Sequence, residues 1–130
     1  MRPVQGSQLK ARILVVDDDP ATAGLLCYFL ESRGFEVTTA SDGNLALEMG
    51  MSGEYQLVIL DVHMPTYDGI ELLRFLRKRY VLRPIKVIAL TGDTSDEVRE
   101  ALTGGGIDSF FTKPVNLAHL ADEVSRLTAA

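Results

Sequence analysis

Polar side chains follow the short apolar segments of this chain, at the point where each segment ends. Asp17 and Asp18 follow one segment, Asp61 follows another, and Thr91 and Lys113 follow two more. If these segments are parallel strands, their carboxyl ends meet at one edge of one sheet. Three carboxylates in one small crevice repel one another unless a cation lies among them. The spacing therefore predicts a divalent-metal site beside a reactive aspartate.

The residue types at these positions suit phosphoryl transfer. Hard cations such as Mg²⁺, for which Mn²⁺ can substitute, bind carboxylate, carbonyl and water oxygens. An aspartate that stays ionised beside the metal can attack phosphorus and form an aspartyl phosphate. Positioning and charge neutralisation then supply most of the catalysis, and an ammonium and a hydroxyl serve that purpose. Lys113 and Thr91 carry those groups.

Apolar runs alternate with helical patterns and would position these side chains. Each of five predicted strands precedes a segment whose apolar residues recur at helical spacing. The predicted strands cover residues 13–16, 35–40, 57–60, 87–90 and 107–112. Capping residues indicate where the helices begin, namely Asp19 before Pro20, Ser41 or Asp42, Asp68, Thr94 and Asn116.

Five strand–helix pairs predict one doubly wound α/β domain, a (βα)5 flavodoxin-like fold with helices on both faces of a parallel sheet. The segment 35–40 alternates apolar and polar residues, which is typical of an edge strand, whereas 57–60 is wholly apolar, which is typical of a central one. These patterns favour the strand order 2-1-3-4-5 for the five-stranded sheet. We expect a loose tail at residues 1–11 and the domain at residues 12–130.

Composition limits the class of protein. Apolar residues make up 46% and charged residues 24% of the chain, as in globular domains. The net charge of −5 argues against direct binding of nucleic acid through a basic surface. The single cysteine, Cys27, fits a reducing compartment, and no apolar run approaches the length that spans a bilayer. We therefore expect a cytoplasmic protein that binds neither membrane nor nucleic acid directly.

Four motifs stand in the order and spacing of a known family, each at a predicted strand end. The chain resembles the receiver domain of response regulators from two-component and phosphorelay signalling, over about residues 12–127. Any one of these motifs is a weak signal, whereas all four together are specific. The motifs are LVVDDDP at 14–20, LDVHMP at 60–65 with Asp68 and Gly69, ALTG at 89–92 and FTKP at 111–114.

The resemblance implies a role for each residue of the acidic site. Asp61 would accept a phosphoryl group from a phosphohistidine and would also contact the metal. Asp18 would bind Mg²⁺ directly, Asp17 would bind it through water, and the backbone carbonyl of His63 would be a further ligand. Lys113 would pair with a phosphoryl oxygen, and a cis peptide bond after it would fix its direction.

The resemblance also implies a switch. Thr91 would turn its hydroxyl toward the phosphoryl group, and the main chain at Gly92 would follow. Phe110, at the position of the family's switch aromatic, would turn inward as Thr91 vacates space. The surface formed by the fourth helix, fifth strand and fifth helix would then change its affinity for a downstream effector. Tyrosine is common at the switch position, and a fixed core phenylalanine is the alternative interpretation of Phe110.

Two residues that flank the site are candidates for setting the lifetime of the phosphoryl group. His63 stands two residues after Asp61, and Asp93 stands two residues after Thr91. Flanking positions of this kind influence the gain and loss of phosphate in the family. Our hypothesis is that the His63 imidazole and the Asp93 carboxylate border the site and tune its rates.

The resemblance implies partners as well. The phosphodonor would be a sensor histidine kinase or a histidine phosphotransfer protein, with small donors such as acetyl phosphate as substitutes. The phosphorylated domain would control a downstream effector or output domain, and a phosphorylation-dependent homodimer is a further expectation. Such a domain catalyses only its own phosphorylation and dephosphorylation and is not otherwise an enzyme.

Three alternatives stand beside this interpretation. A phosphatase of the haloacid dehalogenase type needs a threonine or valine where Ala21 follows Asp17-Asp18-Asp19, and it would turn over small phosphomonoesters. A corrinoid-binding module needs a glycine where Thr66 follows Asp61-Val62-His63, and it would be red when purified. The third alternative is a receiver that serves as an interaction domain without being phosphorylated.

Overall fold

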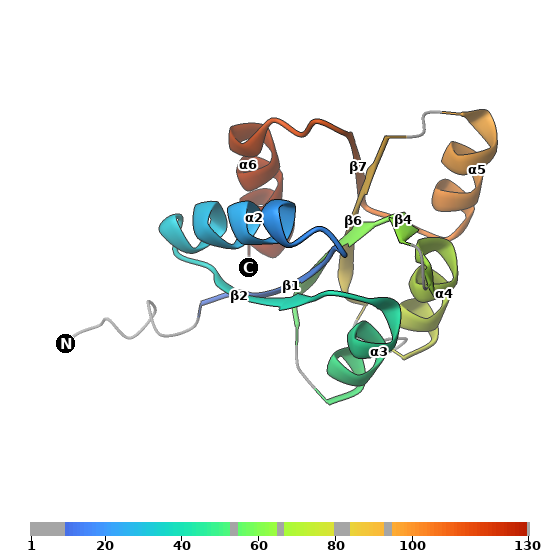
Figure 1. The fold of residues 1–130 in the computed structure, drawn as a ribbon, viewed down its shortest axis with the longest axis horizontal. Coiled ribbons are helices and arrows are strands. Elements are labelled where there is room, and N and C mark those ends of the chain that lie inside the picture. The colour runs from blue at the N-terminus through green and yellow to red at the C-terminus, as the bar shows by residue number, and fades with distance from the viewer. Residues whose placement is uncertain (1–9, 53–54, 65–66, 80–83, 93–94, 130) are drawn as a thin grey trace.

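The computed structural model describes residues 10–52, 55–64, 67–79, 84–92 and 95–129, and its centre is a five-stranded parallel sheet (Figure 1). The strand order is β2-β1-β3-β6-β7, so the predicted order 2-1-3-4-5 is confirmed. The strands of this sheet are β1 (Arg12–Val16), β2 (Glu36–Ala40), β3 (Leu57–Asp61), β6 (Lys86–Thr91) and β7 (Ser109–Thr112).

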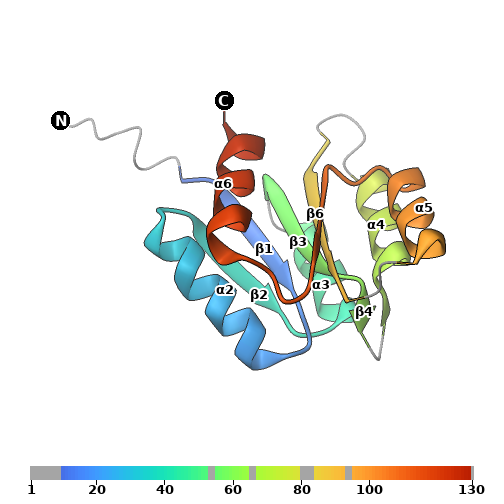
Figure 2. The same ribbon diagram turned by 90° about the horizontal axis from the view of Figure 1, so that it is seen from above.

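Helices cover both faces of the sheet, as the doubly wound fold requires. Helices α2 and α6 lie on one face, and α3, α4 and α5 lie on the other (Figures 1 and 2). Within the described residues no helix is long and apolar enough to cross a membrane. The helices are α2 (Pro20–Ser32), α3 (Gly43–Ser52), α4 (Gly69–Arg79), α5 (Asp96–Gly104) and α6 (Leu117–Thr128).

Strand β3 lies at the centre of the core. All five of its residues are buried, which confirms the interpretation of its apolar run as a strand covered on both faces. Alternate residues of the strands enter two apolar clusters, one under α2 and α6 and one under the other three helices. A two-stranded antiparallel ribbon, β4 (His63–Met64) and β5 (Tyr67–Asp68), follows β3 and was not predicted, because two-residue strands carry no periodic pattern.

Side-chain caps fix the start of several helices. Asp19, Asp42 and Asn116 each accept a hydrogen bond from a backbone N–H two or three residues further on. The predictions for Asp19 and Asn116 are confirmed, and of the two candidates Ser41 and Asp42 the structure selects Asp42. The prediction for α5 was wrong by one residue, because the capping side chain is Ser95, not Thr94. Thr94 itself lies outside the described residues.

An ion pair ties α4 to the start of β7. The Arg77 guanidinium donates to the carbonyl oxygens of Ile85 and Gly106, and it pairs with Asp108 at 3.1 Å between Nη2 and Oδ2. The same carboxylate oxygen accepts from the Val87 N–H at 2.8 Å. The position of the segment that leads into β7 is therefore fixed by hydrogen bonds to α4 and β6.

Helix α4 approaches the end of β3 very closely at its first residue. The Gly69 N–H donates to the Val62 carbonyl at 3.2 Å. A Cβ atom at position 69 would lie 2.7 Å from Val62 Cα and 3.0 Å from the Asp61 carbonyl oxygen. Any side chain larger than hydrogen would therefore push α4 away from the segment that carries Asp61.

We predict that Gly69→Ala lowers the free energy of unfolding by about 1–3 kcal/mol, because the added methyl group overlaps backbone atoms that cannot move aside. The matched control is Gly24→Ala in α2, where a Cβ meets nothing within 4 Å. That variant should be neutral or more stable by up to about 1 kcal/mol, since alanine favours helix. Urea denaturation measures both, and a Gly69→Ala variant as stable as the wild type would contradict the prediction.

Candidate functional site: an acidic pocket at the sheet edge

Three carboxylates meet at the carboxyl edge of the sheet. Strands β1 and β3 are neighbours, so Asp17 and Asp18, which follow β1, lie beside Asp61, the last residue of β3. Carboxylate oxygens of the three lie within 4.8 Å of one another. Asp17 and Asp61 are only 2% and 4% exposed, whereas Asp18 is open to solvent. The predicted clustering of these side chains is confirmed.

Lys113 brings one cation to this acidic pocket, which we define as Asp17, Asp18, Asp61 and Lys113. Its Nζ lies 3.1 Å from Asp61 Oδ2 and 3.9 Å from Asp17 Oδ2. The lysine follows β7, its backbone N–H donates to the Thr91 carbonyl at 2.9 Å, and the peptide bond to Pro114 is cis, as expected. One ammonium faces three carboxylates, so the pocket keeps an excess of negative charge.

The two oxygens of Asp17 have different surroundings. Oδ1 accepts from the backbone N–H of Asp19 at 2.9 Å. Oδ2 is buried and has no hydrogen-bond partner among the described residues. Burial raises the pKa of the Asp17 carboxyl, and the Asp19 N–H and the charge of Lys113 oppose that rise only in part. A buried carboxylate oxygen without a donor is costly, which is a specific reason to expect a cation there.

The donor set of the pocket fits a hard divalent cation. Among the described residues it consists of carboxylate oxygens, the ligands that Mg²⁺ and Mn²⁺ prefer. Asp17, Asp18 and Asp61 would hold the ion. The backbone of His63 begins β4 two residues after Asp61, so its carbonyl remains a predicted further ligand. The His63 side chain and all of Asp93 lie outside the described residues.

The predicted switch residues lie on the two strands next to β3. Thr91 ends β6 and is fully buried, and Gly92 follows it at the surface. Phe110 is half-buried on β7, directly opposite Ala89 in the parallel register. Thr91 therefore shares the pocket's edge of the sheet, whereas Phe110 lies two residues back from that edge.

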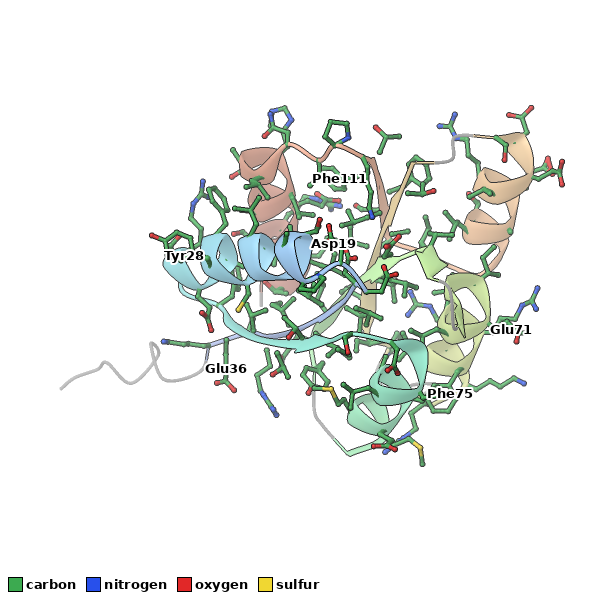
Figure 3. The ribbon with its side chains drawn as sticks, in the orientation of Figure 1. Asp19, Tyr28, Glu36, Glu71, Phe75 and Phe111 are labelled. Atoms are coloured by element: carbon green, nitrogen blue, oxygen red, sulfur yellow. The ribbon has the colours of Figure 1, made fainter. Side chains whose placement is uncertain are left out.

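Two contacts at the site were not predicted. The Asp19 N–H orients Asp17, while the Asp19 side chain caps α2 above the sheet edge (Figure 3). The Arg99 guanidinium of α5 lies over the Phe110 ring, 5.5 Å from its centroid. A capping motif that follows a pair of acids gives a sequence signal for the first contact. No pattern indicates the second, because it joins residues on different elements.

A groove between α2 and β2 leads to Asp17. It has a volume of about 380 Å³ and includes Gly24 and Cys27 of α2. Tyr28 lies at its rim and is 75% exposed, pointing away from the sheet (Figure 3). Leu25, one turn closer to the pocket, is 54% exposed. An apolar surface therefore lies beside the acidic pocket.

Comparison with known proteins identifies the family. The sequence profile described as "Response regulator receiver domain" matches residues 13–125. The transcriptional regulatory protein TcrA of Mycobacterium tuberculosis is 38% identical over 109 residues, 84% of this chain and 42% of that protein. The CAI-1 autoinducer sensor kinase/phosphatase CqsS of Vibrio cholerae is 33% identical over 124 residues, 95% of this chain and 18% of that protein.

Solved structures agree with this comparison. The receiver domain of the Francisella response regulator 1452 is 33% identical and has a TM-score of 0.83, with 91% of this chain and 96% of that chain covered. A CheY-like receiver domain protein from Methanospirillum hungatei is also 33% identical, with a TM-score of 0.83 over 90% of this chain and 92% of that chain.

The fold and the pocket thus define a phosphorelay-type signalling domain, and the chain belongs to the response regulator receiver domain family. It spans less than half the length of the first curated relatives that it matches. The family assignment favours neither the dehalogenase-type phosphatase nor the corrinoid-binding module that the motifs had left open.

We predict that Asp17→Asn raises the thermal stability of the metal-free domain at neutral pH, because the amide removes a buried charge and keeps an acceptor for the Asp19 N–H. The same variant should lose most of the stabilisation that added Mg²⁺ gives the wild type, since a ligand that binds the folded state raises the melting temperature. The pH dependence has the same sign. Because the fold raises the pKa of Asp17, the free energy of unfolding of the wild type falls as the pH rises from the unfolded-state pKa through the folded-state pKa.

Asp18→Asn is the control, since Asp18 is exposed and its charge costs little to keep. It should leave the metal-free melting temperature nearly unchanged while also weakening the response to Mg²⁺. Thermal melts of both variants with and without Mg²⁺ measure these effects. A less stable Asp17→Asn domain in the absence of metal would contradict the claim that the buried, unpartnered Oδ2 of Asp17 destabilises the metal-free fold.

Proposed function

We propose that this receiver domain accepts a phosphoryl group on Asp61 from the phosphohistidine of a histidine kinase or a histidine phosphotransfer protein. The observation that carries the proposal is the Asp61 carboxylate itself, buried at the sheet edge, 3.1 Å from the Lys113 ammonium and beside two further acids. The relatives include both a transcriptional regulator and a sensor kinase, so the domain type occurs at both kinds of position in signalling.

In the proposed step an Asp61 oxygen attacks phosphorus, the O–P bond forms as the P–N bond to the donor imidazole breaks, and the imidazole leaves as the neutral base after taking up a proton. Mg²⁺ bound by the acids would neutralise part of the charge on the transferred group. The Lys113 ammonium moves from the Asp61 carboxylate to a phosphoryl oxygen, and the Thr91 hydroxyl donates to another. Water later hydrolyses the acyl phosphate, so the modification is reversible.

The signal would leave the domain through α5, β7 and α6, which correspond to the fourth helix, fifth strand and fifth helix of the expected switch surface. Thr91 and Phe110 link the pocket to this surface, because they lie on the adjacent strands β6 and β7. The output would be the binding of a downstream effector, an attached output domain or a second copy of the domain. Phosphorylation shifts this equilibrium only if the phosphoryl group favours one arrangement over the other.

The donor protein would dock beside the pocket, where α2 offers exposed apolar side chains. Tyr28 lines the groove that reaches Asp17, and Leu25 is an exposed residue of the same helix. A partner that covers them would bring its phosphohistidine to the mouth of the pocket. We also propose that the domain, residues 12–130, works in the cytoplasm, where such partners present their phosphohistidines.

We expect the wild-type chain, incubated with Mg²⁺ and acetyl phosphate, to gain one phosphoryl group, and Asp61→Asn to gain none because the nucleophile is lost. Intact-mass spectrometry measures the gain. Asp122→Asn, which removes an exposed acid on α6, is the matched control and should be phosphorylated like the wild type. Equal masses with and without donor in the wild type would favour the alternative of an unphosphorylated interaction domain.

The hypothesis that His63 and Asp93 tune the phosphoryl lifetime has its own test. Because an imidazole and a carboxylate that border the pocket would orient or exclude the attacking water, His63→Ala and Asp93→Ala should change the rate of dephosphorylation several-fold. Decay of the phosphorylated mass after removal of the donor measures the rate. Wild-type rates in both variants would reject the hypothesis.

A further inference from the structure

Helix α5 is held to the sheet more weakly than its neighbours. Leu102 is the only fully buried residue of α5, whereas α4 buries four residues and α6 buries three. The start of β7 is fixed by hydrogen bonds: Arg77 of α4 holds the residues just before the strand, and Ser109, its first residue, donates to Glu123 of α6. Few buried contacts mark an element that moves at low cost in free energy. Contacts that do hold α5 therefore have a large influence on its position.

The contact between Arg99 and Phe110 is one of them. The guanidinium carbon lies 5.5 Å from the ring centroid, within the range of a cation–π interaction. Arg99 is exposed, and among the described residues its side chain makes no ion pair or hydrogen bond. Its contact within the described part of the chain is thus with a single aromatic ring, and it joins α5 to β7 across the face of the sheet.

The register of the strands shows which residues lie beside Phe110 on the same face of the sheet. Ala89 lies directly opposite Phe110, and Thr91, two residues further along β6, points to the same face of the sheet. Phe111 points to the other face, into the cluster under α6 (Figure 3). Because Ala89 is small, a ring that turns inward moves toward Thr91, and it leaves the guanidinium behind.

We propose that Arg99 is a positioning residue of the switch: its guanidinium holds Phe110 in the outer, half-buried position and so opposes the rearrangement that phosphorylation favours. This inference rests on the proposed function, since it gives the regulation of that same site. A residue that stabilises the outer ring position lowers the population of the state that binds at the pocket, so it weakens the apparent affinity there by up to the factor by which it shifts the equilibrium. Arg99 thereby sets the basal ratio of the two states.

Beryllofluoride with Mg²⁺, a stable analogue of the aspartyl phosphate, tests this in the full chain, with binding followed by fluorine NMR. A cation–π contact at an exposed site changes an equilibrium constant by about two- to fivefold. Arg99→Ala should therefore bind beryllofluoride about two- to fivefold more tightly than the wild type. The affinity of Arg99→Lys should lie between those of the wild type and Arg99→Ala, because an ammonium contacts the ring less extensively than a guanidinium. This milder variant keeps the test possible even if the alanine variant folds poorly.

Two further variants separate the ring contact from other effects of losing an arginine. Arg33→Ala removes a similar stacking contact, 5.0 Å from the Phe29 ring on α2, and should bind like the wild type. In a Phe110→Leu background, Arg99→Ala should give no gain in affinity, since the ring is absent. Loss of positive charge alone would weaken binding of the anionic analogue, so it cannot produce the expected result.

The outcomes distinguish this inference from the function on which it rests. If the wild type binds beryllofluoride and Arg99→Ala binds equally or more weakly, the role of Arg99 is overturned and the proposed function stands. If neither binds, while Asp61→Asn behaves like the wild type, the proposed function fails and this inference fails with it. A gain in affinity that persists in the Phe110→Leu background would also overturn it, because the ring would not carry the effect.

Discussion

The structure depends on the placement of negative charge at one edge of a parallel sheet. Asp17 and Asp61 are almost completely buried, side by side, at the ends of β1 and β3. Burial of like charges costs free energy, and the single ammonium of Lys113 offsets only part of it. A cation bound among these acids would relieve the excess of negative charge that the fold imposes on the pocket.

The elements around the pocket hold the acids in place by short-range contacts. Asp19 serves two elements at once, since its N–H orients Asp17 and its side chain starts α2. Gly69 lets the first turn of α4 touch the backbone that follows Asp61. The β1–β3 side of the molecule is thus tightly packed, whereas α5 covers its part of the sheet with one fully buried residue. The helix on the same side as Thr91 and Phe110, α5, therefore has fewer buried residues than α4.

Much of the fold could be predicted because it depends on local patterns. The apolar run 57–60 predicted the central strand, the alternation in 35–40 predicted the edge strand, and the strand order then placed Asp17, Asp18 and Asp61 together. The capping roles of Asp19 and Asn116 followed from residue type and position, whereas residue type left Ser41 and Asp42 as two candidates for the cap of α3. Asp61 and Lys113 could be placed at the same edge because each lies at the carboxyl end of a strand of the same sheet, whereas their ion pair was not predicted.

Features that arise from tertiary packing could not be predicted in this way. The β4–β5 ribbon is too short to give a period. Thr94 and Ser95 are both capping residue types, so residue type alone could not choose between them. The lack of a hydrogen-bond partner for Asp17 Oδ2 among the described residues depends on how the folded chain buries this atom. The stacking of Arg99 on Phe110 joins a helix to a strand across a register that only the folded chain defines.

A crystal structure of the domain grown with Mg²⁺ and beryllofluoride would show whether the three acids hold a cation beside an analogue of the aspartyl phosphate. We expect an ion among the carboxylates of Asp17, Asp18 and Asp61, the analogue attached to an Asp61 oxygen, and Lys113 in contact with the analogue. A pocket without the ion, or an analogue bound to another residue while these acids stay as they are, would contradict this expectation.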